Sequence, residues 1–402
     1  MSVETIARPQ ALRRGHVGAV TVAHCSAAFA ALGLPPYLPQ LLPELGDPQA
    51  RWAGVLYVVP TLCTAVAAPI WGRLADRYGR RTLLVRAQLG LALAFTLAAL
   101  ADSLPMLAAA LAAQGLLGGT FAASAAYLAS GLDGQPLARA LALMQGSARA
   151  ALAGAPVLAG LLASELSVRQ MYGLAALLPL VAAVVTLVLP EPGTRAEPVT
   201  ENEPEPEPDR RSRISVRGLC LAEAGFVLAT VVTFPYFLPL AAKIAPELPP
   251  WASALLFALP HLCYLLAAAP ALRFLRDRAR AGLLVGYACA AISALLHLVP
   301  VFLPDAGLGW LIAGRVLLGA ALTCGLTALS QLSAEAARGR APGRLFGTVE
   351  AWSKGGAVVA GVAASALAAW GAAAPLVVAV VTGAVLATSV FRITRATAES
   401  RS

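Results

Sequence analysis

Twelve apolar stretches, each long enough to cross a bilayer as a helix, follow one another along this chain of 402 residues. They lie at 17–42, 52–72, 82–101, 104–130, 140–163, 171–190, 218–241, 251–272, 281–303, 307–332, 345–368 and 372–390. A water-soluble globule is excluded, because only 13% of the residues are charged and 58% are hydrophobic. We therefore predict an all-α integral membrane protein with twelve transmembrane helices.

The lysines and arginines are distributed unevenly between the two sides of these helices. Of the 30 basic residues, 24 lie in the termini and in the loops after the even-numbered spans, with the flank of the first such loop included, and three lie on the opposite side. Because basic loops remain in the cytoplasm, we expect both termini to be cytoplasmic in a multi-pass protein of a bacterial-type inner membrane. The net charge of +9 is therefore explained by orientation in the membrane. We expect a lipid bilayer, and not a nucleic acid, as the partner. The other three basic residues lie inside spans: Arg149, Arg315 and Lys354.

A tract rich in proline and glutamate divides the chain into two halves. It occupies 190–217 and cannot bury apolar area, so we predict a cytoplasmic linker between an N-terminal six-helix bundle at 1–189 and a C-terminal six-helix bundle at 218–402. The two bundles are predicted to be pseudo-symmetric repeats, a layout of transporters with a substrate site between them. Residues match at an offset of about 200, as in Pro39 and Pro239, Trp52 and Trp251, Pro60 and Pro260, Cys63 and Cys263, and Gly115 and Gly319.

The loop after the second span carries a ten-residue motif. Residues 72–81 read GRLADRYGRR, which resembles the G-x-L-a-D-R-x-G-R-R signature of the major facilitator superfamily. The resemblance implies the major facilitator fold and a loop that latches the outward-facing state. Glycines permit close approach, and we expect Asp76 to lie against a neighbouring helix N-terminus. The latch residues implied are Gly72, Asp76, Arg77, Gly79 and Arg80.

Two further motifs bear on the direction and coupling of transport. In the fifth span Gly146, Gly154, Pro156 and Gly160 resemble, with looser spacing, a signature of the family's antiporters, which favours export. In the fourth span Leu111 stands where proton-coupled members of the family carry the arginine of R-x-x-Q-G. The coupling route is therefore left open, and Arg315 in the tenth span is either a relocated coupling residue or a third ligand for an anion.

Charged residues inside spans are costly and usually functional, so they predict the substrate. Arg149 and Lys354 are repeat partners at an offset of 205, as are Gln145 and Glu350. Each cation lies about ten residues into its helix, roughly 15 Å from the interface and near the midplane. Two cations that face one cavity would bind a carboxylate. The alternative is that Lys354 pairs with Glu350 and that Arg149 extends toward the interface.

Other residues complete the predicted site. His24 and Glu223 form another repeat pair, and together with Glu350 they are candidate proton carriers. Three aromatic residues are candidates to line the cavity: Tyr37, Tyr236 and Trp352.

Catalytic motifs are missing from the sequence. It contains no phosphate-binding loop, HExxH or nucleophile elbow, and its cysteines and histidines lack metal-ligand spacing, so we expect no enzyme activity, cofactor or metal. We predict a monomeric secondary transporter that exports a small anionic or zwitterionic organic molecule in exchange for protons, with a citrate-type siderophore as one candidate. The alternatives are a polyspecific multidrug:proton antiporter, a proton-coupled uptake symporter and a membrane receptor that does not transport.

Overall fold

Every regular element in the described part of the chain is a helix. The computed structural model describes residues 12–48, 52–162, 165–191, 215–234, 237–303, 307–368, 370–371 and 373–399. The first half contains α1 (Arg14–Gly33), η1 (Pro35–Tyr37), α2 (Leu38–Leu41), η2 (Leu42–Leu45), α3 (Ala53–Tyr78), α4 (Arg80–Ala99), α5 (Leu104–Leu117), α6 (Thr120–Gly131), α7 (Gly134–Leu162) and α8 (Val168–Leu187). The second half contains α9 (Val216–Val231), α10 (Phe237–Ile244), α11 (Pro250–Phe274), α12 (Ala279–Phe302), α13 (Leu308–Ala336), α14 (Pro342–Ala368) and α15 (Ala373–Glu399).

These helices form twelve segments of membrane length among the described residues. Nine are long and apolar enough to cross a membrane by length and composition, with α5 and α6 counted as one. The other three are α7, α14 and the consecutive pair α9 and α10. Arg149 interrupts the apolar face of α7, and Glu350 and Lys354 interrupt that of α14. In these three segments the apolar stretch is thus interrupted by charged residues or, between α9 and α10, by a break.

Two predicted spans are not continuous helices. The span predicted at 104–130 breaks at Gly118 and Gly119, where Gly119 has φ +77°, a backbone conformation that residues with a side chain rarely adopt. The span predicted at 17–42 ends at Gly33 and continues as the short helices η1, α2 and η2, because Pro35 has no N–H with which to continue the hydrogen bonds of α1. Apolar composition alone does not reveal such breaks, since the residues on both sides are apolar.

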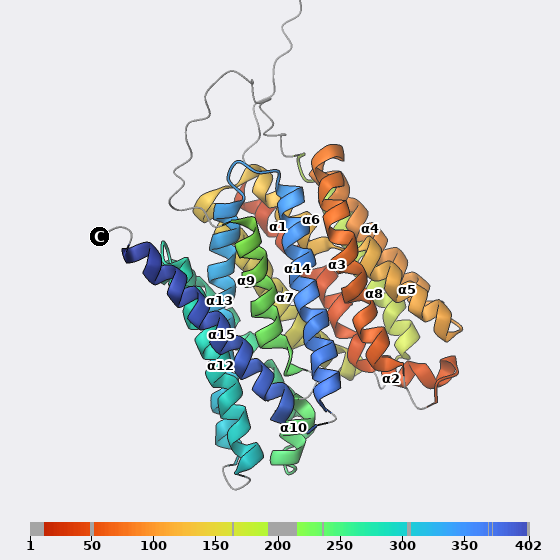
Figure 1. Cartoon of the computed structure of the whole chain (residues 1–402). Helices are drawn as coiled ribbons and strands as arrows, with labels where there is room; N and C mark the ends of the chain where they lie inside the picture. Colours follow the sequence, from red (N-terminus) through yellow and green to blue (C-terminus); the bar gives the residue numbers. More distant parts are fainter. Residues whose placement is uncertain are drawn as a thin grey trace, which may run out of the picture.

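The two halves fold into two six-helix bundles that meet along α14 and α7. Figure 1 shows α14, in blue, standing between α3 of the first half and α9 of the second. In addition α14 contacts α6, while α7 contacts α11 and α13. Most of the predicted linker, 192–214, lies outside the described residues.

The bundles touch most closely where α3 approaches the start of α14. We call this end of the molecule the loop end; it holds the turn at Gly79 between α3 and α4. A Cβ added to Gly343 would lie 2.2 Å from the Gly72 carbonyl oxygen, and one added to Gly347 would lie 2.5 Å from that of Ala68. Backbone therefore packs on backbone here, which closes the interface between the bundles at this end.

We predict that Gly347→Ala destabilises this interface. The added methyl group would clash with backbone that cannot rotate away, which costs about 1–3 kcal/mol and lowers the temperature of unfolding in detergent. The matched control is Gly355→Ala on the same helix, because a Cβ there meets nothing within 4 Å and alanine favours the helix by about 0.5–1 kcal/mol. Equal unfolding temperatures for the two variants would contradict the close contact.

Candidate functional site

A cavity of about 380 Å³ lies between the two bundles. Its lining comes from α1, α3, α5, α6 and α7 of the first half and from α9, α13 and α14 of the second. It extends from Pro35 and Leu38, at the end opposite the loop end, to Gly119 and Val349. The volume is that of a pocket for a small organic ligand, and both repeats contribute to it.

Four charged side chains line this cavity. They are Arg149 on α7, Glu223 on α9, and Glu350 and Lys354 on α14. Within the described part of the chain, no ion pair of 4.0 Å or less joins any two of them. The direct Glu350–Lys354 pair, which the sequence left open, is therefore not formed. The guanidinium Nε of Arg149 is buried without a hydrogen-bond partner among the described residues.

Glu350 instead binds the first bundle. Its Oε2 accepts a hydrogen bond of 2.7 Å from the backbone N–H of Ala122, the third residue of α6. The N-terminus of a helix carries unpaired N–H groups and a partial positive charge, so a carboxylate there is favourable. The break at Gly119 thus exposes a helix N-terminus inside the membrane, and a carboxylate from the other bundle occupies it.

Opposite charge holds the other side of the same break. The Arg86 guanidinium donates to the Gly118 carbonyl at 3.2 Å, and the Trp71 indole donates to the Leu116 carbonyl at 2.6 Å. Arg86 also stacks on the Trp71 ring, with 3.6 Å from Cζ to the ring centroid. A cation near the C-terminus of α5 complements the negative end of that helix. Arg86 falls within the span predicted at 82–101, close to the basic loop that precedes this span, and its position in the sequence alone did not indicate this contact.

The remaining predicted polar residues also face the cavity. Gln145 lines it, as does His24, whose ring lies edge-on to Phe121 with centroids 5.6 Å apart. Both ring nitrogens of His24 are buried without a partner among the described residues. Glu223 accepts a hydrogen bond of 3.3 Å from the Ser353 hydroxyl of α14. The roles of these residues in binding or proton transfer stay predictions.

Asp76 lies at the loop end, against the start of α14. Its two carboxylate oxygens accept hydrogen bonds from the backbone N–H groups of Gly343 at 2.9 Å and Arg344 at 2.7 Å. Arg80, one turn later, lies 3.3 Å from the same carboxylate. The expected contact between Asp76 and a helix N-terminus is present, and it joins the two bundles.

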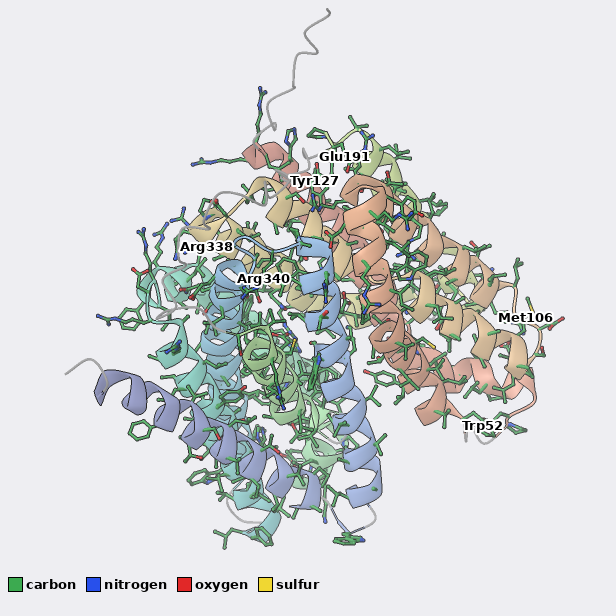
Figure 2. All side chains as sticks on the ribbon, turned by 45° about the horizontal axis from the view of Figure 1, so that its top comes forward. Trp52, Met106, Tyr127, Glu191, Arg338 and Arg340 are labelled. Carbon is green, nitrogen blue, oxygen red and sulfur yellow. The ribbon has the colours of Figure 1, made fainter. Side chains whose placement is uncertain are left out.

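A second carboxylate, not singled out from the sequence, holds this end together. Glu191 accepts hydrogen bonds from the backbone N–H groups of Arg80 at 2.9 Å and Arg81 at 3.3 Å, at the start of α4. Figure 2, which turns the loop end toward the viewer, places Glu191 beside Tyr127, whose hydroxyl donates to the Pro190 carbonyl at 2.7 Å. The acidic residue was predicted as part of the linker, so only the fold reveals its contacts.

The second half carries a degenerate copy of the motif at 273–278, which reads RFLRDR without the glycines, and this copy lacks these contacts. Asp277, the repeat partner of Asp76, has φ +63°, and among the described residues no hydrogen bond or ion pair to its side chain is formed. The asymmetry agrees with the lost glycines in that copy.

Comparison with known proteins identifies the family of this chain. The sequence profile of the Major Facilitator Superfamily matches residues 20–302. The chain belongs to the Major Facilitator Superfamily. It has the multi-pass, all-helical fold of that family, as the sequence motif implied.

Relatives and a solved structure support this assignment. The multidrug resistance protein MdtG of Proteus mirabilis (strain HI4320) is 33% identical over 157 residues, 38% of this chain and 39% of that protein. The MdtG of Escherichia coli O9:H4 (strain HS) is 28% identical over 331 residues, 77% of each chain. The chain thus covers less than half the length of the first of these relatives. The human organic anion transporter MFSD10 (TETRAN) has the same fold, with a TM-score of 0.74 at 19% identity over 95% of this chain and all of that one.

Arg315 does not line the cavity between the two bundles, contrary to its prediction as a substrate ligand. Its side chain is 2% exposed, and its guanidinium donates to the Leu256 carbonyl at 2.9 Å and to the Phe257 carbonyl. The guanidinium also lies over the Phe237 ring, 4.1 Å from its centroid. Helix α11 therefore satisfies this arginine within the second bundle, which no sequence pattern indicated.

The predicted aromatic ligands are also placed elsewhere or lie outside the described part. Trp352 is 44% exposed and does not line the cavity, nor does Tyr37. Tyr236 lies outside the described residues. Tyr57 and Phe121 are instead the aromatic residues in the described lining of the first half.

The antiporter-like glycines lie on α7 where it meets other helices. A Cβ added to Gly146 would lie 3.7 Å from the Tyr264 ring of α11, and one added to Gly154 would lie 3.7 Å from the Phe29 ring of α1. Pro156 and Gly160 lie in the same helix, but nothing beyond their backbone is described. The Tyr264 hydroxyl donates to the Ala142 carbonyl at 2.9 Å, a further contact between the bundles.

We predict that Arg315→Met destabilises the second bundle. The change leaves two buried carbonyls without a charged donor, which costs about 2–3 kcal/mol and lowers the unfolding temperature in detergent. Arg276→Met is the control, because Arg276 is an exposed arginine in the same bundle. If both variants unfold at the wild-type temperature, Arg315 has no structural role.

Proposed function

We propose that this transporter exports small organic molecules from the bacterial cytoplasm by proton antiport. The observation that carries the proposal is the single cavity in which Arg149 and Lys354, from repeat-related helices, face Glu223 and Glu350. Two cations supply a site for a carboxylate, while two carboxylates supply groups that can carry a proton. The substrate is a small anionic or zwitterionic molecule.

The loop end is the cytoplasmic end in this proposal. The positive-inside rule supports that orientation, because the arginines of the Gly72–Arg81 loop and the exposed Arg338 lie there. The backbone contact of Gly72 with Gly343 then closes the cytoplasmic side, while the cavity reaches the opposite end. In this proposal the molecule is in its outward-facing state, and Asp76 acts as the latch.

Protonation of Glu350 is the proposed link between proton and substrate. A neutral carboxylic acid loses the charge that favours the N-terminus of α6, so the contact with Ala122 weakens and the bundles are released. The charged groups that face Glu350 in the cavity are Lys354 on its own helix, Arg149 and Glu223, with His24 nearby on α1. A bound substrate carboxylate would interact with Arg149 and Lys354, the cations that also face Glu350. Substrate binding and protonation of Glu350 therefore both change the net charge of the same cavity.

Export of several unrelated drugs is the second candidate function. The MdtG relatives are named multidrug resistance proteins, and much of the cavity lining is apolar, from Leu32 and Leu38 to Leu152 and Phe226. Such a lining accepts varied apolar bodies. A growth-inhibition screen in an efflux-deficient strain with anionic, zwitterionic and cationic compounds distinguishes a narrow substrate range from a broad one.

We predict that Arg149→Ala and Lys354→Ala each reduce transport of anionic or zwitterionic substrates about tenfold or more, through loss of a charge-assisted hydrogen bond. Uptake into everted membrane vesicles, driven by a pH gradient, measures the effect. Flux in the opposite direction would favour an uptake symporter, and binding without flux would favour a receptor. If neither substitution alters transport of any anion, the proposed anion site is wrong.

We predict that Glu350→Gln abolishes transport driven by a pH gradient and retains exchange of substrate for substrate. Glutamine preserves the shape but cannot release a proton. Glu165→Gln is the control, because Glu165 is exposed in the turn between α7 and α8. Gradient-driven transport by Glu350→Gln at the wild-type rate would exclude Glu350 as the coupling residue.

We predict that Asp76→Asn weakens the closed loop end, because an amide lacks the charge that complements the start of α14. A cysteine placed at the loop end should then react faster with a thiol reagent, by about fivefold for a loss of about 1 kcal/mol. Asp277→Asn, the repeat partner without such contacts, should leave the rate unchanged. Equal rates for the two variants would contradict the latch.

A further inference from the structure

The internal repeat holds at the level of side-chain packing. Gly115 of α5 packs on α3, where an added Cβ would lie 2.2 Å from the Pro60 carbonyl and 2.6 Å from Cys63. Gly319 of α13 packs on α11 in the same way, 2.5 Å from Cys263 and 3.3 Å from Pro260. The two helix pairs are therefore equivalent, and residues four positions before each glycine occupy equivalent places.

In the second half this place is filled by Arg315. Pro260 has no N–H, so the Leu256 carbonyl, four residues earlier, has no donor within its helix. The Arg315 guanidinium supplies the missing donor at 2.9 Å and also bonds the Phe257 carbonyl. It lies over the rings of Phe237 and Phe257, with 4.1 Å and 5.5 Å to the centroids. Carbonyl oxygens and aromatic faces thus form a cage for a planar cation.

In the first half the same place holds Leu111, which has no donor. Pro60 likewise leaves the Leu56 carbonyl without an intrahelical donor, and no side chain of a described residue donates to it. All three residues line the inter-bundle cavity, together with Tyr57, the repeat partner of Phe257, and Gln114. The Leu111 side chain, 3% exposed, fills the position that corresponds to the guanidinium of the second half, and the cavity borders this position.

We infer that this part of the cavity is a subsite for a cationic group of the substrate, an ammonium or a guanidinium. The carbonyl left free by Pro60 and the amide oxygen of Gln114 accept its hydrogen bonds, and the Tyr57 ring offers a cation–π contact. The substrate supplies here what Arg315 supplies in the other repeat. Because Arg149 and Lys354 line the same cavity, the favoured substrate is a zwitterion. This deepens the proposed function and rests on it only for transport.

The test compares binding of two probes that differ in one cationic group. Norfloxacin carries a carboxylate and a piperazinium ammonium, whereas nalidixic acid is a similar carboxylate without the amine. Equilibrium dialysis against the purified full-length protein in detergent at pH 7 gives both dissociation constants. Wild type should favour norfloxacin about tenfold, the size of one cation–π or charge-assisted contact. Leu111→Arg places a guanidinium in the subsite and should abolish that preference, with nalidixic acid bound at least as tightly as before.

The controls keep the outcome decisive. Leu111→Met fills the same volume without charge and should retain the preference. Leu111→Lys replaces Leu111→Arg if the latter fails to elute as a folded monodisperse protein. Equal affinity of wild type for the two probes, binding of neither, or an unchanged preference in Leu111→Arg would each overturn the subsite. Dialysis involves no gradient, so a failed antiport assay with a retained preference would refute the proposed function and leave the subsite in place.

Discussion

Carboxylates on helix N-termini hold the two bundles in their observed relation. Asp76 of the first bundle binds the start of α14, and Glu350 of α14 binds the start of α6 in the first bundle. Both contacts involve one helix, so α14 is fixed to the first bundle at two levels, at the loop end and inside the cavity. Each contact combines backbone hydrogen bonds with the helix dipole. Because backbone N–H groups do not titrate, the charge of the carboxylate alone decides whether each contact is favourable. At Gly72, Gly343 and Gly347 the backbones of α3 and α14 touch. This close packing requires that the two carboxylate contacts hold α14 at one fixed position along α3.

The second contact exists because α5 and α6 are separate helices. A continuous helix would use the Ala122 N–H internally, and Glu350 would then be a carboxylate without a donor in a membrane interior, which is costly. Gly119 creates the break through its positive φ, and Arg86 with Trp71 satisfies the carbonyls that the break leaves free. Three residues far apart in sequence therefore depend on one glycine. Broken helices of this kind place dipole ends where a transporter binds charge, and here the ends are occupied by protein side chains of opposite sign.

The sequence allowed the membrane fold, the repeat and the contact of Asp76 to be predicted, because each rests on a pattern that is local or repeated: apolar length, proline spacing, or a ten-residue motif. It also placed Arg149 and Lys354 on repeat-related helices that face one cavity. It did not predict the break at Gly119, since glycines are frequent in membrane helices, nor the burial of Arg315, since a free carbonyl becomes visible only when α11 and α13 are packed together. Glu191 was hidden in a tract whose composition indicates a linker. What composition and spacing miss are contacts in which one partner is backbone.

The proline-freed carbonyls unite these observations. A proline in a membrane helix leaves one carbonyl without its intrahelical donor, and this carbonyl must be hydrogen-bonded by another group. In the second bundle Arg315 bonds it, and that bundle is closed at this place. In the first bundle Leu111 stands at the position of the arginine, the carbonyl of Leu56 has no such donor, and both residues border the cavity. The first copy of the duplicated framework thus has a proline-freed carbonyl beside the cavity, without the guanidinium that bonds it in the second copy. In the second copy of the repeat a side chain, Arg315, bonds the free carbonyl. The chemistry of that side chain is therefore a physical guide to the ligand that the first copy can accept.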